Sequence, residues 1–344
     1  MNGFISLLSI RFKFHMNNRN ISKKILYWYD NNKRILPWRK QTLKKQKQYF
    51  ILVSEFMLQQ TQVKTVIPYF KNFVKKVTTL NALSKISDKK LMKYWEGLGY
   101  YSRARNLKKT AEKIISDYDG NLPNNIEDLK TLPGIGDYTS RAIMAIAFNK
   151  PYIPLDGNVE RILKRIFYLK KKSEISKDNL NKKKKFFGSS ARSSDYAQAI
   201  MEIGALICKP INPLCSECPI SKNCLSLKKN DFQIIPKNKF HKIKYFEAKI
   251  YENKNKYLLI KNNKYNFLKN FLIFPMKEVK KNDFKSSINR KLNIKISNID
   301  MKIIINKNNK MPKIKGSFLL DKNKIKNNIL PSFTRKIFKT VTEY

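Results

Sequence analysis

The chain has 344 residues, enough for about two domains, and 42% of them are hydrophobic, which supplies a core for both. No apolar run approaches the ~20 residues of a membrane span, so we expect a soluble chain with no membrane partner. The formal net charge of +47 favours a nucleic-acid partner, although Lys, Asn and Ile are abundant throughout and part of the excess is a compositional bias.

The first 20 residues predict a disordered leader. They contain a short apolar patch, and the basic residues follow this patch rather than precede it. No small-residue cleavage site comes after it, so the segment does not fit a signal peptide. Met16 is an alternative start. From residue 21 to residue 228 the pattern is mostly helical. The segment 54–76 places apolar residues such as Val66 and Phe70 on one helical face with lysines opposite.

A tight helical hairpin is expected in the middle of the chain. Helices over residues 126–131 and 137–148 are joined by a turn that contains Gly134 and Gly136. Glycine permits positive φ there and close approach of a partner, and the free N–H groups at the start of the second helix can receive a phosphate. By itself this G-x-G pattern fits a plain turn equally well. A lysine-rich loop is expected at residues 170–185.

Two carboxylates are candidates for chemistry. Asp156 stands at the expected start of a helix, just after two prolines, and Glu55 lies in an apolar helical stretch. Two carboxyls in unlike environments can divide the roles of acid and charged stabiliser. The alternatives are a surface acid for Glu55 and a helix N-cap for Asp156.

All four cysteines of the chain lie close together, with the spacing C-x6-C-x2-C-x5-C. This grouping indicates one metal or cluster site rather than a disulfide framework. It fits an iron–sulfur cluster better than a structural zinc, which usually has two short C-x2-C pairs. The candidate ligands are Cys208, Cys215, Cys218 and Cys224.

Six motifs, taken in order with the cysteine spacing, resemble those of the helix-hairpin-helix DNA glycosylases that carry a [4Fe–4S] cluster, specifically the MutY-type adenine DNA glycosylases. The resemblance covers residues 36–224. The motifs are Leu36–Arg39, Ser54–Thr61, Gly97–Arg105, Leu132–Tyr138, Leu155–Val159 and Met201–Ala205.

The resemblance implies a fold and a set of roles. It implies a mostly helical catalytic domain over residues 21–228, with a six-helix module and a cluster loop at 208–224. It assigns Glu55 as the acid that protonates adenine, Asp156 as the carboxylate beside the sugar, and Tyr138 and Asn158 as residues that orient them. The flipped base would meet a pocket lined by Trp38, Arg39, Leu58, Val63 and Gln198.

Other residues would contact the rest of the DNA. The resemblance implies that Gln60, Leu98 and Tyr100 lie near the base opposite the adenine, that Thr61 binds the substrate, and that Gly134 and Gly136 meet the backbone. Trp38 and Leu58 could instead be ordinary core residues, and Tyr100 a surface aromatic. The implied substrate is duplex DNA with adenine paired to 8-oxoguanine or guanine, bound by a monomer in the bacterial cytoplasm.

Endonuclease III, which acts on oxidised pyrimidines, is the nearest alternative. That branch has a lysine where this chain has Tyr138, and a phenol cannot form the Schiff base that leads to strand cleavage. The sequence therefore predicts a monofunctional glycosylase. A non-catalytic basic DNA-binding protein with a structural zinc is the second alternative.

The C-terminal part, residues 232–344, changes to short alternating segments that predict strands at residues 242–251, 257–260 and 271–274. It loosely resembles the family's MutT-like (NUDIX-like) domain, without the Nudix box. Relatives recognise 8-oxoguanine through Phe-Ser-His or Phe-Thr-His, and the nearest match here is Phe333, Thr334 and Arg335, with arginine in place of histidine. A chance strand segment explains that match equally well.

Overall fold

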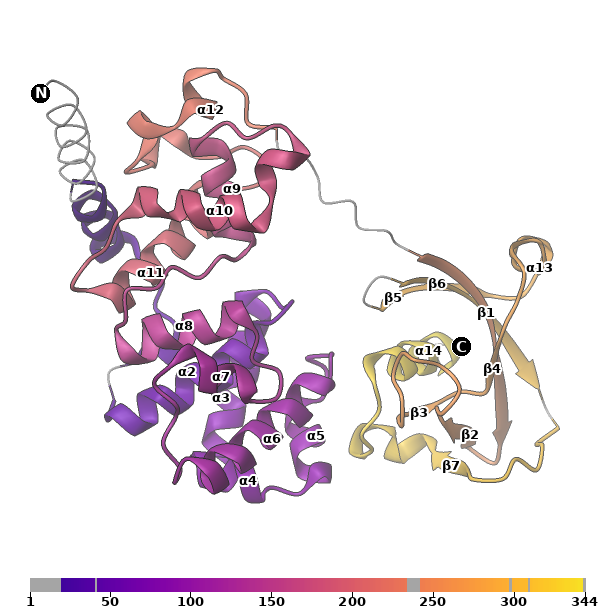
Figure 1. Cartoon of the computed structure of the whole chain (residues 1–344). Coiled ribbons are helices and arrows are strands. Elements are labelled where there is room, and N and C mark those ends of the chain that lie inside the picture. The colour runs from indigo at the N-terminus through magenta and orange to yellow at the C-terminus, as the bar shows by residue number, and fades with distance from the viewer. Residues whose placement is uncertain (1–19, 41, 234–241, 297–298, 309, 343–344) are drawn as a thin grey trace, which may run out of the picture. The chain divides into compact units, whose positions relative to one another are not determined.

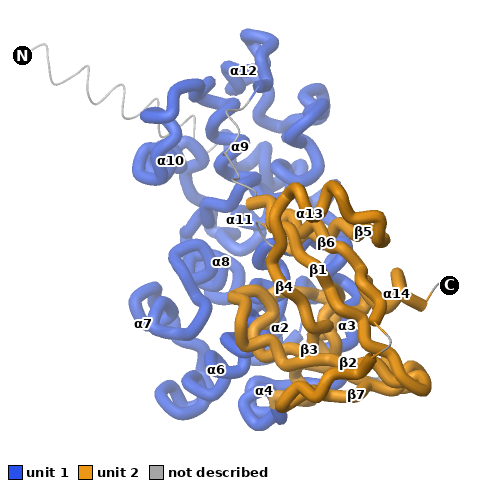
Figure 2. Tube along the Cα trace, turned by 90° about the vertical axis from the view of Figure 1, so that its right-hand side faces the viewer, with its two compact units in different colours: residues 1–87, 102–236 blue, residues 88–101, 237–344 orange. Residues whose placement is uncertain are grey.

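The protein forms two compact units, each assembled from two segments of the chain. The structure is a computed structural model, and it describes residues 20–40, 42–233, 242–296, 299–308 and 310–342. The expected leader lies outside these residues, apart from residue 20. Among the described helices, none combines the length and apolarity that crossing a bilayer requires. The units comprise residues 1–87 with 102–236, and residues 88–101 with 237–344 (Figure 2). Figure 1 labels the helices and strands.

The first unit is helical. Its N-terminal helix spans residues 20–32. The α-helices that follow are α2 (Lys44–Leu58), α3 (Val63–Lys76), α4 (Leu80–Lys85), α6 (Ser102–Asp117), α7 (Ile126–Thr131), α8 (Asp137–Phe148), α9 (Gly157–Ile166), α10 (Lys177–Lys183), α11 (Ser193–Glu202) and α12 (Leu225–Lys228). The shorter turns are η1 (Pro37–Arg39), η2 (Lys172–Ile175), η3 (Lys184–Phe187), η4 (Ile203–Ile207), η5 (Cys215–Glu217) and η6 (Ser221–Asn223).

Two expectations for this unit need correction. The stretch 54–76 is not one helix: α2 ends at Leu58, and Gln60 has a left-handed φ of 58° before α3 begins. The lysine-rich stretch 170–185 is not a loop, because Ser176 accepts a hydrogen bond from the backbone of Asn179 and so caps α10. The hairpin helices α7 and α8 have the predicted bounds.

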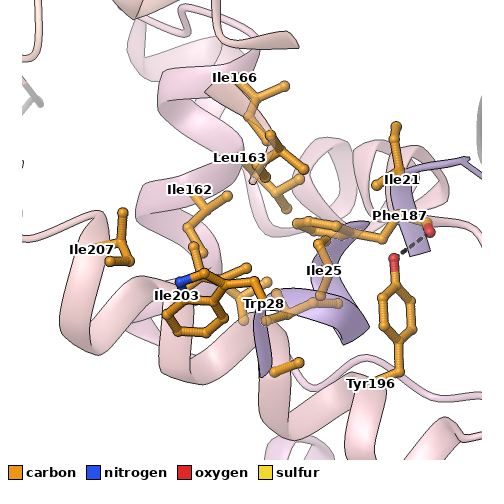
Figure 3. Packing of buried hydrophobic residues seen from close by; sticks show 14 of the residues in the cluster. Ile21, Ile25, Trp28, Ile162, Leu163, Ile166, Phe187, Tyr196, Ile203 and Ile207 are labelled. Atoms are coloured by element: carbon orange, nitrogen blue, oxygen red, sulfur yellow. Dashed lines mark hydrogen bonds between the residues drawn. The ribbon is translucent and has the colours of Figure 1, made fainter. Parts of the chain in front are cut away.

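The N-terminal helix packs into one apolar cluster with α9 and α11 (Figure 3). The Tyr196 hydroxyl, buried in this cluster, donates a 2.6 Å hydrogen bond to the carbonyl of Phe187 and so satisfies its polar end. This packing fixes α9, whose first residue follows Asp156. The labelled members are Ile21, Ile25, Trp28, Ile162, Leu163, Ile166, Phe187, Tyr196, Ile203 and Ile207.

The second unit contains a mixed sheet. Its elements are α5 (Asp88–Trp95), β1 (Lys242–Asn253), β2 (Lys256–Lys261), β3 (Leu272–Ile273), β4 (Met276–Glu278), α13 (Lys281–Ser286), β5 (Lys291–Ile296), β6 (Ile299–Asn308), β7 (Ser317–Asp321), η7 (Lys322–Asn327) and α14 (Ser332–Thr342). The sheet order is β3-β2-β1-β6-β5, with β4 also on β1 and β7 also on β2. β1 and β6 run parallel, with Phe246 opposite Ile303. A mostly helical region followed by a C-terminal domain with a mixed sheet is therefore confirmed.

The segment from Phe333 to Arg335 is helical rather than a strand. It forms the first turn of α14, where Phe333 and Thr334 are buried against the sheet. The Thr334 hydroxyl donates to the carbonyl of Leu272 at 2.8 Å. These two side chains therefore belong to the core of the domain.

Candidate active site

A cavity of about 1060 Å³ opens in the helical unit. Four elements supply its polar wall: Glu55 comes from the last turn of α2, Tyr138 from the first turn of α8, Asp156 from the residue before α9, and Gln198 from α11. Glu55, Tyr138 and Asp156 thus lie at helix ends, whereas Gln198 lies inside α11. The two candidate carboxylates therefore line the same cavity.

Glu55 is almost fully buried, with 6% of its surface exposed. Burial, together with the negative charge of Asp156, raises its pKa from 4.5 to about 7 against the opposing effects of Arg39 and of a hydrogen bond with Tyr138. A carboxyl with such a pKa retains its proton up to neutral pH. Glu55 is therefore suited to act as an acid.

Asp156 is held by hydrogen bonds that favour its charged form. One carboxylate oxygen accepts the Val159 backbone N–H at 2.7 Å, which makes Asp156 the N-cap of α9, and the other accepts the Asn158 side-chain amide at 3.0 Å. Burial nevertheless raises the pKa of Asp156 above 3.8. Asp156 is both an N-cap and a cavity residue, so the two interpretations of it coexist.

Asn158 is itself fixed from behind. Arg161 on α9 donates to the Asn158 side-chain oxygen at 2.7 Å and to the carbonyls of Gly204 at 2.6 Å and Cys208 at 2.7 Å. A Cβ on Gly204 would lie 2.5 Å from the Cβ of Asn158, so only glycine fits there. These contacts set the direction of the amide that Asn158 presents to Asp156.

The phenol of Tyr138 interacts electrostatically with both acids. Burial raises the pKa of its phenol well above 10, and the charges of Glu55 and Asp156 raise it further. Its hydroxyl also lies 3.8 Å from the sulfur of Met201. Tyr138 therefore stays protonated and can only donate or accept a hydrogen bond.

Most of the other predicted pocket residues also line the cavity. Trp38 does so while its ring makes an edge contact with Phe70 at 5.3 Å between centroids, so it has a core role as well. Gln198 lines the cavity, but its amide nitrogen donates to the Ser194 carbonyl at 3.1 Å within α11. The predicted residues that line this cavity are Trp38, Arg39, Glu55, Leu58, Thr61, Val63, Tyr138, Asp156, Asn158 and Gln198.

The remaining predicted residues lie elsewhere. Gln60 is exposed, in the break between α2 and α3. Leu98 and Tyr100 belong to the second unit, where Leu98 is buried and Tyr100 is 41% exposed with a φ of 47°. Their roles at the opposite base stay predictions.

The sequence analysis assigned no role to a buried ion-pair network in the cavity wall. Glu202 is 1% exposed and accepts hydrogen bonds from Arg34 at 2.7 Å and from Arg39 at 2.8 Å. Its partners lie far away in the sequence, so no local pattern indicates this network. The Nε of Arg39 is buried and has no hydrogen-bond partner among the described residues, so it remains a donor for a ligand in the cavity.

The hairpin turn is fixed by close packing. Gly134 has a φ of 83°, and a Cβ there would lie 2.9 Å from the Phe56 ring and from Asn106, so only glycine fits. The Thr110 hydroxyl donates to the Pro133 carbonyl at 2.8 Å. Gly136, the N-cap of α8, supplies no capping side chain, and a Cβ there would meet open space. The turn can thus present backbone N–H groups outward.

The four cysteines occupy the segment 208–224, hereafter the cysteine loop, and none is in a disulfide. Burial, together with the charges of the other cysteines, raises the pKa of Cys218 to about 12. Arg165 faces the loop, donating to the Cys208 sulfur at 3.3 Å and to the Lys209 carbonyl at 2.6 Å. In the described part of the chain, no three His, Cys, Asp or Glu side chains converge as a single-ion site. Four thiols with a guanidinium on one sulfur have the chemistry to hold an anionic iron–sulfur cluster.

Comparison with known proteins identifies the family. Residues 53–185 match the model of the HhH-GPD superfamily of base excision DNA repair proteins. An adenine DNA glycosylase of Buchnera aphidicola subsp. Baizongia pistaciae is 38% identical over 288 residues, which cover 80% of this chain and 79% of that protein. The human adenine DNA glycosylase is 41% identical over 207 residues, which cover 58% of this chain and 38% of that longer protein.

Solved structures agree on the fold. The structure of a thermostable thymine-DNA glycosylase matches with a TM-score of 0.55 and 27% identity, covering 62% of this chain and 98% of that one. A trapped endonuclease III–DNA covalent intermediate matches with a TM-score of 0.51 and 21% identity, covering 62% of this chain and 96% of that one, which supports the fold alone. The chain belongs to the adenine DNA glycosylases, within the helix-hairpin-helix superfamily of base excision repair proteins.

Proposed function

We propose that this protein is a monofunctional adenine DNA glycosylase of base excision repair, acting on adenine paired with 8-oxoguanine or guanine in duplex DNA. The observation that carries the proposal is the presence of Glu55 and Asp156 in one cavity, with burial raising the pKa of both carboxyls. Relatives named adenine DNA glycosylase supply the identity of the base.

The two acids divide the work of breaking the C1′–N9 bond. Glu55, protonated up to neutral pH, gives its proton to the adenine ring, so that the base leaves as a neutral molecule. Positive charge develops on the deoxyribose, and the ionised Asp156 stabilises it, held in place by Val159 and Asn158. Water then adds to C1′, and Glu55 takes up the proton that the water loses.

The base reaches these groups only after it has left the duplex. A purine stacked in DNA is inaccessible, so it must be extruded into the cavity. The free Nε donor of Arg39 matches the acceptor nitrogens on a purine edge, and Glu202 holds the guanidinium in position. We assign Trp38, Leu58 and Val63 to the apolar wall of this pocket and Gln198 to its polar rim.

A base-release assay tests the proposal. Wild-type protein should release adenine from duplexes with adenine opposite 8-oxoguanine or guanine, whereas Asp156→Asn and Glu55→Gln should each release it at least about 100-fold more slowly. Asn at position 156 can still cap α9, which keeps the fold intact. Release of an oxidised pyrimidine instead of adenine would favour the endonuclease III alternative.

The absence of an amine nucleophile at Tyr138 makes the enzyme monofunctional. A phenol cannot form a Schiff base with the abasic sugar, so the strand stays intact after base release. Borohydride should therefore trap no covalent complex between the protein and DNA with an abasic site. Rapid strand cleavage with a trapped complex would contradict this.

The helical unit contacts DNA through phosphate-binding groups. The hairpin turn at Gly134 and Gly136 and the net charge of +47 both favour the backbone of duplex DNA. Gln60, Leu98 and Tyr100 contact the region of the opposite base, and the protein acts as a monomer. The C-terminal domain is a diverged NUDIX-like domain. If adenine opposite 8-oxoguanine and adenine opposite guanine were excised at equal rates, the enzyme would have no preference for the lesion.

The cysteine loop holds one [4Fe–4S] cluster. Cys208, Cys215, Cys218 and Cys224 are its ligands, and when bound the cluster supplies structural rigidity rather than a chemical step. The lysines of the loop, such as Lys209 and Lys222, contact phosphates. Iron and sulfide in equal amounts with a broad visible absorption would support the cluster, while a colourless protein with one zinc would contradict it.

A further inference from the structure

The C-terminal domain carries an ion pair that no part of the proposed reaction uses. Arg335 on α14 donates to one carboxylate oxygen of Glu96 through Nε at 3.0 Å and also through Nη2. The same guanidinium donates to the carbonyls of Ile325 at 3.2 Å and Asn328 at 2.9 Å. Each of its three nitrogens therefore has an acceptor within the protein.

Glu96 is equally committed. Its side chain is 12% exposed, and it also accepts from the Leu330 backbone N–H at 3.2 Å and from Lys93 at 3.0 Å. Burial opposes its ionisation, but these hydrogen bonds outweigh burial and lower its pKa below 4.5. A half-buried pair with this many charge-assisted hydrogen bonds is stronger than an ordinary surface ion pair.

Glu96 directly precedes a loop with an unusual backbone. Gly97 and Gly99 have φ values of 94° and 74°, and Tyr100 has a φ of 47°, which a residue with a side chain rarely adopts. At the other end of this loop the Tyr101 ring lies against Phe271, with 4.4 Å between the centroids. The loop, residues 97–101, is thus anchored at both ends to side chains of the C-terminal domain, within the same compact unit.

The segment from Phe333 to Arg335, the nearest match to the relatives' Phe-Ser-His or Phe-Thr-His element, is held within the protein. Phe333 and Thr334 are buried, the Thr334 hydroxyl donates to Leu272, and Arg335 is bound by Glu96. Arginine in place of the relatives' histidine therefore has a structural partner in this chain. Its charge is neutralised inside the protein.

We propose that Arg335 is a positioning residue, which acts through Glu96 to fix the loop 97–101 to the C-terminal domain, so that the loop and the domain engage the base opposite adenine as one body. This inference rests on the proposed function. Tyr100, 41% exposed at the tip of the loop, is the side chain so positioned. Arg335 itself does not contact the opposite base.

A double-mutant cycle tests the coupling. The variants are Glu96→Gln, Arg335→Gln and the two together. Each single variant should weaken binding to a duplex with 8-oxoguanine opposite a non-cleavable adenine analogue by about tenfold, and the double variant should bind no more weakly than either one, since they share one interaction. The excision rate at saturating enzyme should stay within about twofold of wild type, because the acids of the cavity are untouched.

A matched control exists in the same domain. Lys277 on β4 pairs with Glu247 on β1 at 3.0 Å, away from the loop in sequence. Lys277→Gln should leave binding unchanged, and Arg335→Lys, which keeps the charge with fewer donors, should have an intermediate effect. Circular dichroism of each variant checks that it has folded.

Hydrogen exchange separates this inference from the proposed function. In the free protein, Arg335→Gln should speed exchange of the loop amides at residues 97–101, whereas Lys277→Gln should not. This readout needs no substrate, so it holds even if wild type releases no adenine. The proposal would be overturned if the losses of affinity in the two single variants multiplied in the double variant, or if hydrogen exchange of the loop were unchanged in Arg335→Gln. It would also be overturned if Arg335→Gln lost binding and Glu96→Gln did not, because Arg335 would then contact DNA directly.

Discussion

The rate of base excision should fall as the pH rises through the pKa of Glu55. Burial raises that pKa from 4.5 to about 7, and only the protonated acid can transfer a proton to adenine. One pH unit above its pKa about one carboxyl in eleven is protonated, so the rate at pH 8 should be roughly a tenth of the rate at pH 6. Glu55→Gln should be slow and nearly flat across this range.

The same shift has a consequence for stability. In the unfolded chain Glu55 titrates near 4.5, whereas in the folded protein it titrates near 7. The stability of the folded state is therefore undiminished below pH 4.5, falls as the pH rises towards 7, and is constant above that. The loss reaches about 3 kcal/mol, since each pKa unit is worth about 1.4 kcal/mol.

Glu55→Gln removes this loss because the amide never ionises. The variant should be more stable than wild type by about 3 kcal/mol at pH 8 and within about 1 kcal/mol of it at pH 5. Urea denaturation at both pH values measures the difference, and single-turnover excision from pH 5.5 to 8.5 measures the rate. The exposed acid Glu112 on α6 offers a control, since Glu112→Gln should change neither quantity. A rate that is level over this range, or an equal stability difference at both pH values, would refute the assignment of Glu55 as the acid.

Three comparisons test other parts of the structure. Gly134→Ala should lower the free energy of unfolding by more than about 1 kcal/mol, because the residue has positive φ and no room for a Cβ, while Gly136→Ala should cost less; urea denaturation compares them. Gly204→Ala should slow excision at saturating enzyme by about tenfold, because the new methyl group would displace Asn158; an unchanged rate would contradict that packing. Lys222→Gln should reduce the slope of log affinity against log salt by about 1, and an unaltered slope would mean that the exposed Lys222 meets no phosphate.

The sequence predicted the parts of the site whose signal is local. The hairpin helices and the cysteine grouping follow from spacing, and Glu55 and Asp156 stand in recognisable motifs. The break after α2 was missed because the polar residues 59–62 include no glycine or proline, although Gln60 turns the backbone left-handed. The helix cap at Ser176 was not predicted, because the lysines around it favoured a loop.

The long-range parts of the structure could not be predicted. Glu202 acquires its role from Arg34 and Arg39, which are more than 160 residues away in the chain, so no local pattern identifies it. Likewise, the predicted domain boundary near residue 230 does not indicate that the segment 88–101 groups with the C-terminal domain. The residues that Glu96 and Tyr101 contact are far away in the sequence. Only the folded arrangement brings these residues together.

One guanidinium links the cysteine loop to Asp156, the carboxylate proposed to face the sugar. Arg161 spans the Cys208 carbonyl and the Asn158 side chain, and Asn158 in turn holds Asp156. The cysteine loop therefore supports Asp156. A displacement of its first residue, Cys208, would be transmitted over two hydrogen bonds to the Asn158 amide, which donates to Asp156. Substitutions in the cysteine loop and substitutions at Asn158 should therefore weaken the same support of Asp156, and their effects should not be additive.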